Sequence, residues 1–149
     1  MRIVIQRVTR ASVSIEGRVE SAIEKGMMVL LGVGYADTDD DIDWLVKKTI
    51  NLRIFDDSEG VMNLPVKDVE GSILVVSQFT LMASCKKGNR PSYIHAASPD
   101  VSVPLYERFC QRLSESLGKP VSTGVFGADM QVELVNDGPV TIVIDSKDK

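Results

Sequence analysis

The chain has 149 residues and a formal net charge of −4, with 44% hydrophobic and 26% charged residues. This length and balance fit one globular domain spanning residues 1–149. Proteins that bind long stretches of nucleic acid are usually basic. The net negative charge therefore argues against that class, and any contact with nucleic acid is expected to be small and local.

Apolar patterning predicts strands through the first part of the chain. Residues 2–8 alternate loosely, and residues 12–15 and 18–22 flank Glu16-Gly17 in a short hairpin pattern. The run GMMVLLGVG at 26–34 is continuously apolar, is bounded by glycines and is too short for a typical helix. It therefore predicts a strand that is buried on both faces.

Two helices are predicted from residues that repeat on one face. Thr38 can cap a helix that begins among Asp39–Asp41. Apolar side chains then recur on one face of this helix to about Leu52. A second helix is predicted from about Ser102 to Leu117, with an apolar residue at every fourth position. Gly118 follows directly and can terminate this helix.

The remaining segments read mostly as strand. SILVVSQFTL at 72–81 predicts a second buried strand, VSTGVFGADM at 121–130 and MQVELV at 130–135 are strand-like, and a last strand follows Pro139. About eight strands and two main helices indicate an α/β fold with mixed α+β character. We expect a single domain of mostly antiparallel or mixed sheets, with the two helices on the outer faces.

NDGPVT interrupts this last strand-like region. Asn136–Pro139 has turn chemistry, because glycine tolerates positive φ and proline fixes φ and lacks a backbone donor. One interpretation is an ordinary hairpin loop between two strands. The other is a loop that presents its own backbone to a ligand, and local sequence alone favours the hairpin.

The location of the protein is predicted from what the sequence lacks. MRIVIQRV at the start has no charged region followed by a long apolar run, so it does not look like a signal peptide. No apolar stretch approaches the ~18 residues that a membrane span needs. Cys85 and Cys110 have no metal-ligand spacing and are expected to be free thiols in a reducing compartment. We expect a cytoplasmic protein without membrane partners.

Most familiar catalytic equipment is also missing. His95 is the only histidine, and the chain has no Gly-x-Ser-x-Gly elbow and no phosphate-binding Walker loop. Too few histidines and cysteines are present for paired metal ligands, and DTDDDIDW lacks the glycine and distal glutamate of a calcium loop. We expect no metal and no cofactor, and chemistry that relies on backbone dipoles or on a group of the substrate.

Two polar motifs remain, SQFTL (Ser77–Leu81) and NDGPVT (Asn136–Thr141). Together they resemble the signature motifs of the D-aminoacyl-tRNA deacylases, also called D-tyrosyl-tRNA deacylases. IQRVTRASV, GMMVLLGV, RIFDDSEGVMNL and NRPSY also look like family segments in family order. The resemblance therefore covers nearly the whole chain, and the pair of motifs is specific where neither would suffice alone.

The resemblance implies hydrolysis of the ester that joins a D-amino acid, and also glycine, to the terminal adenosine of tRNA. It implies a homodimer with active sites at the interface, in which a cis Gly138–Pro139 peptide enters the partner subunit's pocket. The two carbonyls would bind the substrate ammonium, and the main chain would collide with an L side chain. Ser77 and Asn136 are assigned to the same substrate-binding region, and Arg7 is expected to brace the Gly-Pro loop.

The resemblance assigns catalysis to Gln78, Phe79 and Thr80. Backbone N–H groups around Phe79 and Thr80 would stabilise the developing oxyanion, with assistance from the terminal 2′-hydroxyl of the tRNA. A hydrolase that uses Thr80 or a cysteine as a covalent nucleophile is an alternative, although no base is evident for any of them. A second alternative is a non-catalytic module that binds nucleic-acid ends or associates with DNA.

Contacts to the RNA are expected from two further segments. The segment that would hold the adenine supplies Phe126, Gly127, Ala128 and Met130. The loop CKKGNRPSY supplies Lys86, Lys87 and Arg90, which are either solvated or in contact with the acceptor stem. His95 has no assigned role and is expected at the surface.

Overall fold

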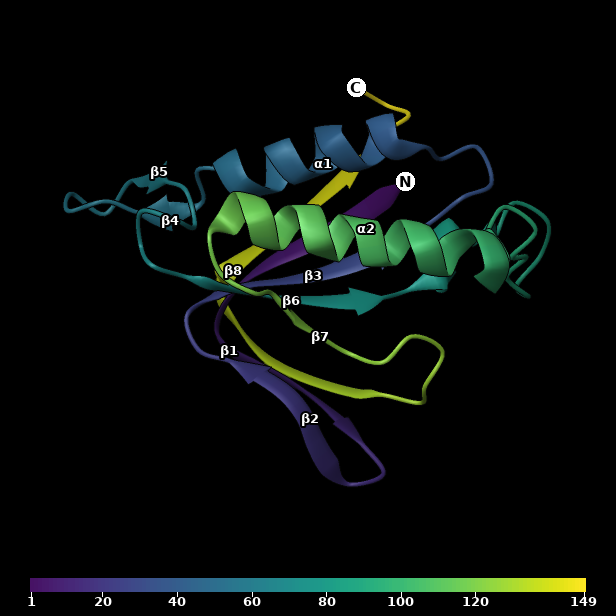
Figure 1. Cartoon of the computed structure of the whole chain (residues 1–149), viewed down its shortest axis with the longest axis horizontal. Coiled ribbons are helices and arrows are strands. Elements are labelled where there is room, and N and C mark those ends of the chain that lie inside the picture. Colours follow the sequence, from purple (N-terminus) through teal and green to yellow (C-terminus); the bar gives the residue numbers. More distant parts are fainter.

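The computed structural model describes residues 1–149. One six-stranded sheet has the order β2-β1-β3-β6-β7, with β8 paired to β1, and β4 and β5 form a separate small sheet. The helices α1 and α2 lie side by side over the larger sheet (Figure 1). The elements are β1 (Arg2–Ile15), β2 (Arg18–Ile23), β3 (Gly26–Gly32), α1 (Asp39–Asn51), β4 (Phe55–Asp56), β5 (Met62–Leu64), β6 (Ser72–Ser77), the 3₁₀ helix η1 (Phe79–Met82), α2 (Pro99–Leu117), β7 (Ser122–Thr123) and β8 (Gln131–Asp145).

This arrangement confirms the mixed α/β class with two helices. No helix is both long and apolar enough to span a membrane. The helices were expected on the outer faces, and both lie on the same side of the sheet. Below the sheet, in the view of Figure 1, β2 and the neighbouring parts of β1 and β8 bend away and nearly close the sheet on that side.

β1 is the organising strand of the sheet. Its first part pairs antiparallel with β3, its second part pairs with β2, and its other edge pairs with β8 along almost its whole length. The two strands expected at 2–8 and 12–15 are therefore one continuous strand. Ile5 shows the arrangement, because it lies opposite Val29 on one side and Ile142 on the other.

β3 lies between β1 and β6, which explains its continuous apolar sequence. Met27, Val29 and Leu31 belong to the main core beneath the helices. Met28, on the opposite face, belongs to a smaller core with Val13 and the facing residues of β6. Successive side chains of a strand alternate between faces, so a strand with a core on each side needs apolar residues throughout. The expected double burial of this strand is confirmed.

The two helices begin in different ways, α1 with polar side-chain caps and α2 with a proline in its first turn. Thr38 and Asp41 form a capping box at the start of α1, in which the Thr38 N–H donates to Asp41 Oδ2 at 2.8 Å. α2 begins at Pro99 rather than at Ser102, because Ser98 occupies the N-cap position and proline suits the first turn. Gly118 ends α2 in a left-handed conformation, as its position predicted.

The strand expected at 72–81 is shorter than its apolar pattern indicated. β6 ends at Ser77, and the chain turns into η1. The Leu81 N–H donates to the Gln78 carbonyl at 3.2 Å, which tightens the chain into this turn. Gly32 makes room for it, since a Cβ at that position would lie 2.9 Å from Leu81 Cβ and 3.0 Å from the Gln78 carbonyl oxygen. The polar Ser-Gln pair marks the end of the strand.

The hairpin interpretation of NDGPVT is wrong, because β8 does not reverse there. Asn136 pairs with Val8 and Thr141 pairs with Gln6, so both flanks lie beside the same strand. Gln6 and Val8 are two positions apart in β1, whereas their partners Thr141 and Asn136 are five positions apart in β8. The extra residues of β8 form a bulge at Asp137–Val140. VSTGVFGADM was also expected as a strand, but only Ser122–Thr123 pairs, and a loop leads from there to β8.

Candidate functional site

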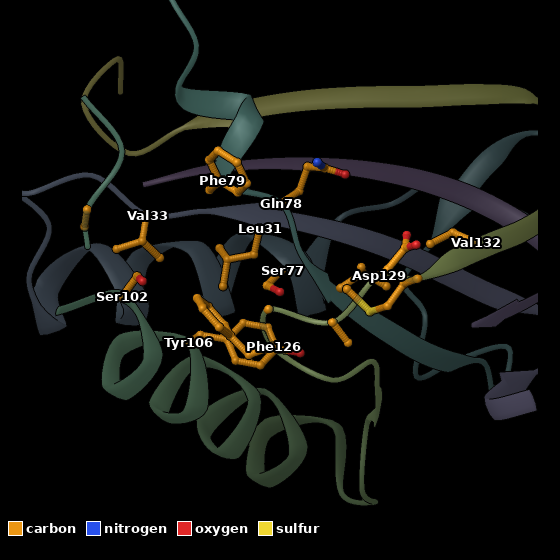
Figure 2. A pocket seen from close by; sticks show the side chains of 15 residues that line it. Leu31, Val33, Ser77, Gln78, Phe79, Ser102, Tyr106, Phe126, Asp129 and Val132 are labelled. Atoms are coloured by element: carbon orange, nitrogen blue, oxygen red, sulfur yellow. The ribbon is translucent and has the colours of Figure 1, made fainter. Parts of the chain in front are cut away.

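A cavity of about 310 Å³ opens where β3 and β6 end, between η1, the first turns of α2 and the loop before β8 (Figure 2). Fifteen residues line it, and ten of them are hydrophobic. Such a volume with mostly apolar walls suits a flat organic group the size of a nucleobase. Polar groups from the end of β6 enter one wall.

The SQFTL motif forms that polar wall. Ser77, Gln78 and Phe79 line the cavity, and Phe79 is 56% exposed. Thr80 does not line it, and its Oγ1 accepts a hydrogen bond of 2.5 Å from Gln78 Nε2. No histidine, lysine or carboxylate is bonded to the Thr80 hydroxyl. Phe79 and Thr80 begin η1, so their N–H groups have no acceptor within that short helix.

The segment assigned to adenine lies across the cavity from this motif. Phe126, Gly127, Ala128 and Met130 all line it. The Phe126 ring packs edge-on against the Tyr106 ring of α2, with centroids 5.7 Å apart. The structure therefore brings together SQF from the end of β6 and the FGADM segment from the loop before β8, although 49 positions separate Ser77 from Phe126 in the sequence.

The Gly-Pro bulge is held rigidly to its own chain. The buried Arg7 donates from Nε to the Asp137 carbonyl at 2.9 Å and from Nη1 to the Ile54 carbonyl at 2.8 Å. Asn136 spans the bulge, because its Oδ1 accepts from the Val140 N–H at 2.9 Å and its Nδ2 donates to Thr141 Oγ1 at 2.8 Å.

The Gly138–Pro139 peptide bond is cis, and Gly138 has a φ of +134°. Both residues are exposed. Neither they nor Arg7 and Asn136 line the cavity of the same chain. The structure thus separates the residues assigned to substrate binding into two groups, Ser77 in the cavity wall and the bulge outside it.

Comparison with known proteins assigns the family. The model of the family described as D-Tyr-tRNA(Tyr) deacylase matches residues 4–145. The chain belongs to this deacylase family. The resemblance inferred from SQFTL and NDGPVT is confirmed.

Individual relatives are similar to this chain over nearly its whole length. A protein of Bacteroides fragilis (strain YCH46) named D-aminoacyl-tRNA deacylase is 66% identical over 100% of this chain and 99% of its own length. A solved structure described as c-Myc DNA Unwinding Element Binding Protein has a TM-score of 0.93 and 41% identity, covering 97% of this chain and 98% of the other. Another, described as a probable eukaryotic D-amino acid tRNA deacylase, has a TM-score of 0.81 at 20% identity, covering 96% and 97%, and shares the fold.

The basic loop of this deacylase lies next to the cavity wall. Lys86, Lys87 and Arg90 are exposed and form no ion pairs. The loop is closed by an antiparallel bridge between Ser84 and Ser92. His95 is exposed, as expected, and does not line the cavity.

Sequence reasoning missed the α2 side of the deacylase cavity. Tyr106 lines it, is buried, and donates from its hydroxyl to the Val75 carbonyl at 3.1 Å. Burial raises the pKa of Tyr106, so its hydroxyl stays protonated and acts as a donor. Ser102 and Asp129 also contribute to the lining. Tyr106 follows Leu105 in the apolar stripe of the helix, and no local pattern distinguishes it from a core residue.

Proposed function

We propose that the protein hydrolyses the ester bond between a D-amino acid and the 3′-terminal adenosine of tRNA, and spares the L-aminoacyl ester. One observation carries this proposal: a single cavity gathers both the SQF segment and the FGADM segment in a member of the deacylase family. The 66% identical relative is named for this activity. A cytoplasmic location fits such a substrate.

The cavity supports a division of labour between base binding and chemistry. The adenine ring would lie against Phe126, which Tyr106 holds in place through edge-on packing. The ester carbonyl would then face the start of η1, where N–H groups of Phe79 and Thr80 stabilise the negative charge that develops on the oxygen. Gln78 would keep its amide on Thr80 and so fix the geometry of this turn.

The reaction needs a water molecule and no covalent enzyme intermediate. Water adds to the ester carbonyl carbon, the bond to the ribose 3′-oxygen breaks, and the water's proton passes to that oxygen. The adjacent ribose 2′-hydroxyl is placed to relay this proton, which suits a site with no histidine or carboxylate bonded to Thr80. The products are the free D-amino acid and the deacylated tRNA.

Chirality would be sorted by the bulge of a second copy of the chain. Gly138 and Pro139 are exposed and lie outside their own cavity, so they are available to a partner. β8 pairs only with β1, and its free edge is flanked by exposed Val132, Val135 and Val143. An unpaired edge with apolar side chains is a ready surface for self-association. Glycine, which lacks a side chain, would not be rejected.

The proposal is tested by incubating purified protein with D-Tyr-tRNA and with L-Tyr-tRNA. We expect the D ester to be cleaved at least tenfold faster, which corresponds to about 1.4 kcal/mol in the barrier. Equal rates on the two esters, or no cleavage of either, would contradict the proposal. Sedimentation of the same preparation should show a dimer, and an active monomer would exclude the bulge from acting in a second copy.

A second candidate is nucleic-acid binding without catalysis. The solved structure that is 41% identical is described as a protein that binds the c-Myc DNA unwinding element. A net charge of −4 disfavours a grip on a long duplex. Tight, catalysis-independent binding of duplex DNA, together with no cleavage of D-Tyr-tRNA, would favour this candidate over the deacylase.

A further inference from the structure

We propose that Tyr93 and the basic loop at 85–91 form a second nucleotide subsite, which holds the unpaired nucleotide that precedes the terminal adenosine. The proposal rests on the proposed function for the identity of the RNA. It adds a residue, Tyr93, that lies outside the cavity and has no part in the chemistry described above.

The loop is built to hold Tyr93 in one place. The Ser84 N–H donates to the Ser92 carbonyl at 2.8 Å, and the Ser92 N–H donates to the Ser84 carbonyl at 2.9 Å. This pair of hydrogen bonds closes the loop at its base. Tyr93 follows immediately, and its carbonyl accepts from the Ala96 N–H at 3.0 Å. The backbone at Tyr93 is thus held by hydrogen bonds on both sides along the chain.

The Tyr93 ring extends the wall of the cavity outward. It packs against Phe79 with centroids 5.2 Å apart and an interplanar angle of 68°. Phe79 lines the cavity, whereas Tyr93 does not. Phe79 and Tyr93 remain 56% and 42% exposed, so they present aromatic surface to solvent at the cavity mouth. Figure 2 shows Phe79 at this edge of the cavity.

Exposed aromatic surface beside a base-sized cavity suits an unstacked nucleotide. Proteins that bind single-stranded RNA commonly place successive bases on aromatic side chains, because every base offers a flat face for stacking. A base in the cavity and a base on Tyr93 would be neighbours, since Phe79 both lines the cavity and packs against Tyr93. With the terminal adenine against Phe126 and the preceding base against Tyr93, the site would bind two consecutive nucleotides.

The charges of the loop favour a nucleotide over a protein partner. Lys86, Lys87 and Arg90 are exposed and unpaired in a chain whose net charge is −4. Phosphates are the groups that such free cations bind in RNA. A second copy of this acidic chain would bring fewer negatively charged groups to the loop than an RNA strand, which carries a phosphate at every nucleotide.

Binding of short, unreactive RNA tests the subsite without any catalysis. The probes are the ribotrinucleotide CCA and adenosine alone, titrated by calorimetry. The parent protein should bind CCA at least tenfold more tightly than adenosine. Tyr93→Ala should weaken CCA binding roughly tenfold, or about 1.4 kcal/mol, and leave adenosine binding unchanged. Tyr93→Phe keeps the ring and should retain parent affinity.

The basic loop is tested by a matched pair of double variants. Lys86→Ala/Lys87→Ala should weaken CCA binding and reduce its dependence on salt concentration. Lys25→Ala/Lys67→Ala removes the same charge from exposed, unpaired positions elsewhere and should leave CCA binding unchanged. Equal effects of the two double variants would show a general charge effect and contradict the role of the loop.

Kinetics separate this proposal from the proposed function. Tyr93→Ala should raise KM for D-Tyr-tRNA and leave hydrolysis of D-tyrosyl-adenosine, which lacks the preceding nucleotide, unchanged. Equal loss on both substrates, a parent protein that binds CCA no better than adenosine, or a changed oligomeric state of Tyr93→Ala would overturn the subsite. CCA binding as expected, with no cleavage of either ester, would contradict the deacylase function and leave the nucleotide subsite standing.

Discussion

At the scale of single residues, Gly138 is the position where an added side chain has the clearest consequence. A Cβ there would lie 2.8 Å from Val140 Cγ2 and 3.2 Å from Arg7 Nη2, and the φ of +134° disfavours any L side chain. Arg7 also holds the Asp137 carbonyl, so a displaced Arg7 would release the bulge. Space and backbone conformation both require glycine.

We predict that Gly138→Ala lowers kcat/KM for D-Tyr-tRNA at least tenfold, about 1.4 kcal/mol in the barrier. Steady-state deacylation measures this, with circular dichroism and scattering to confirm that the variant keeps the fold and the assembly state of the parent. Gly60→Ala is the matched control, because Gly60 also has a positive φ of +76° but has no atom within 4 Å of its added Cβ. A Gly138→Ala variant with the parent's fold and assembly state that cleaves D-Tyr-tRNA at the parent rate would refute this role.

The candidate nucleophiles lack the groups that would activate them. The Thr80 hydroxyl is bonded only to the Gln78 amide, which is not a base. Burial raises the pKa of Cys110 to about 12, so its thiol is un-ionised at neutral pH. Cys85 is exposed in the basic loop and does not line the cavity.

We therefore expect Thr80→Ala to retain activity within roughly tenfold of the parent, whereas loss of a true nucleophile typically costs far more. Cys85→Ala and Cys110→Ala should be close to the parent in kcat. Single-turnover hydrolysis of D-Tyr-tRNA measures all three. Mass spectrometry that trapped an aminoacyl group on any of these side chains would establish the covalent alternative instead.

At the scale of elements, the contact between β3 and η1 positions the turn that carries Phe79 and Thr80. Gly32 ends β3 beneath η1, where a Cβ would press on Leu81 and on the Gln78 carbonyl. On the other side, Arg2 Nη1 donates to the Leu81 carbonyl at 2.7 Å. The turn that presents Phe79 and Thr80 is therefore positioned by two strands that are distant from it in sequence.

Gly32→Ala should displace η1 and lower kcat on D-Tyr-tRNA at least tenfold, about 1.4 kcal/mol, with a smaller change in KM. Gly71→Ala introduces a comparable crowding, 2.8 Å from Val66 Cγ2, at a site remote from the cavity. It should reduce the free energy of unfolding and spare kcat. Kinetics and urea unfolding of the two variants separate the effects, and equal losses of kcat would mean that η1 has no special dependence on Gly32.

Some elements of the fold are specified by the local pattern of apolar residues, and others depend on contacts with distant parts of the chain. Continuous apolar runs predicted β3 and the core of β6, and four-residue repeats predicted both helices, because burial imposes these periods directly. The continuation of β8 through NDGP depends on pairing with β1, more than 120 positions away, and turn residues alone cannot reveal it. η1 depends on the space left by Gly32. Tyr106 was missed because a cavity-lining side chain and a core side chain follow the same helical period.

At the scale of the whole molecule, the buried Asp41 and the half-buried Asp145 link stability to pH. Burial opposes ionisation of Asp41, but hydrogen bonds from Lys147, Ser146 and the Thr38 N–H outweigh it and hold the pKa of Asp41 well below its usual range. For Asp145 burial again raises the pKa, and hydrogen bonds from the Lys147 N–H and Arg2 lower it further than burial raises it. Both groups bind protons more weakly in the folded chain than in the unfolded one.

A lowered folded pKa gives stability that is complete above the unfolded pKa, about 3.9 for aspartate, and is lost as the pH falls toward the folded value. We predict a free energy of unfolding that changes little through these groups between pH 7 and 5 and declines below about pH 4. Urea unfolding across this range measures it. Asp41→Asn should be less stable at pH 7 and should show a shallower decline in acid; an unchanged acid decline would exclude Asp41 as a cause.

In the proposed function, one cavity performs the hydrolysis and main chain, rather than a side-chain pocket, rejects L-amino acids. Its most direct test is a single-turnover comparison of D-Tyr-tRNA, Gly-tRNA and L-Tyr-tRNA under identical conditions. We predict cleavage of the D-tyrosyl and glycyl esters, and cleavage of the L-tyrosyl ester at least tenfold slower than either, about 1.4 kcal/mol in the barrier. Cleavage of L-Tyr-tRNA as fast as D-Tyr-tRNA, or rejection of glycine together with L-tyrosine, would contradict it.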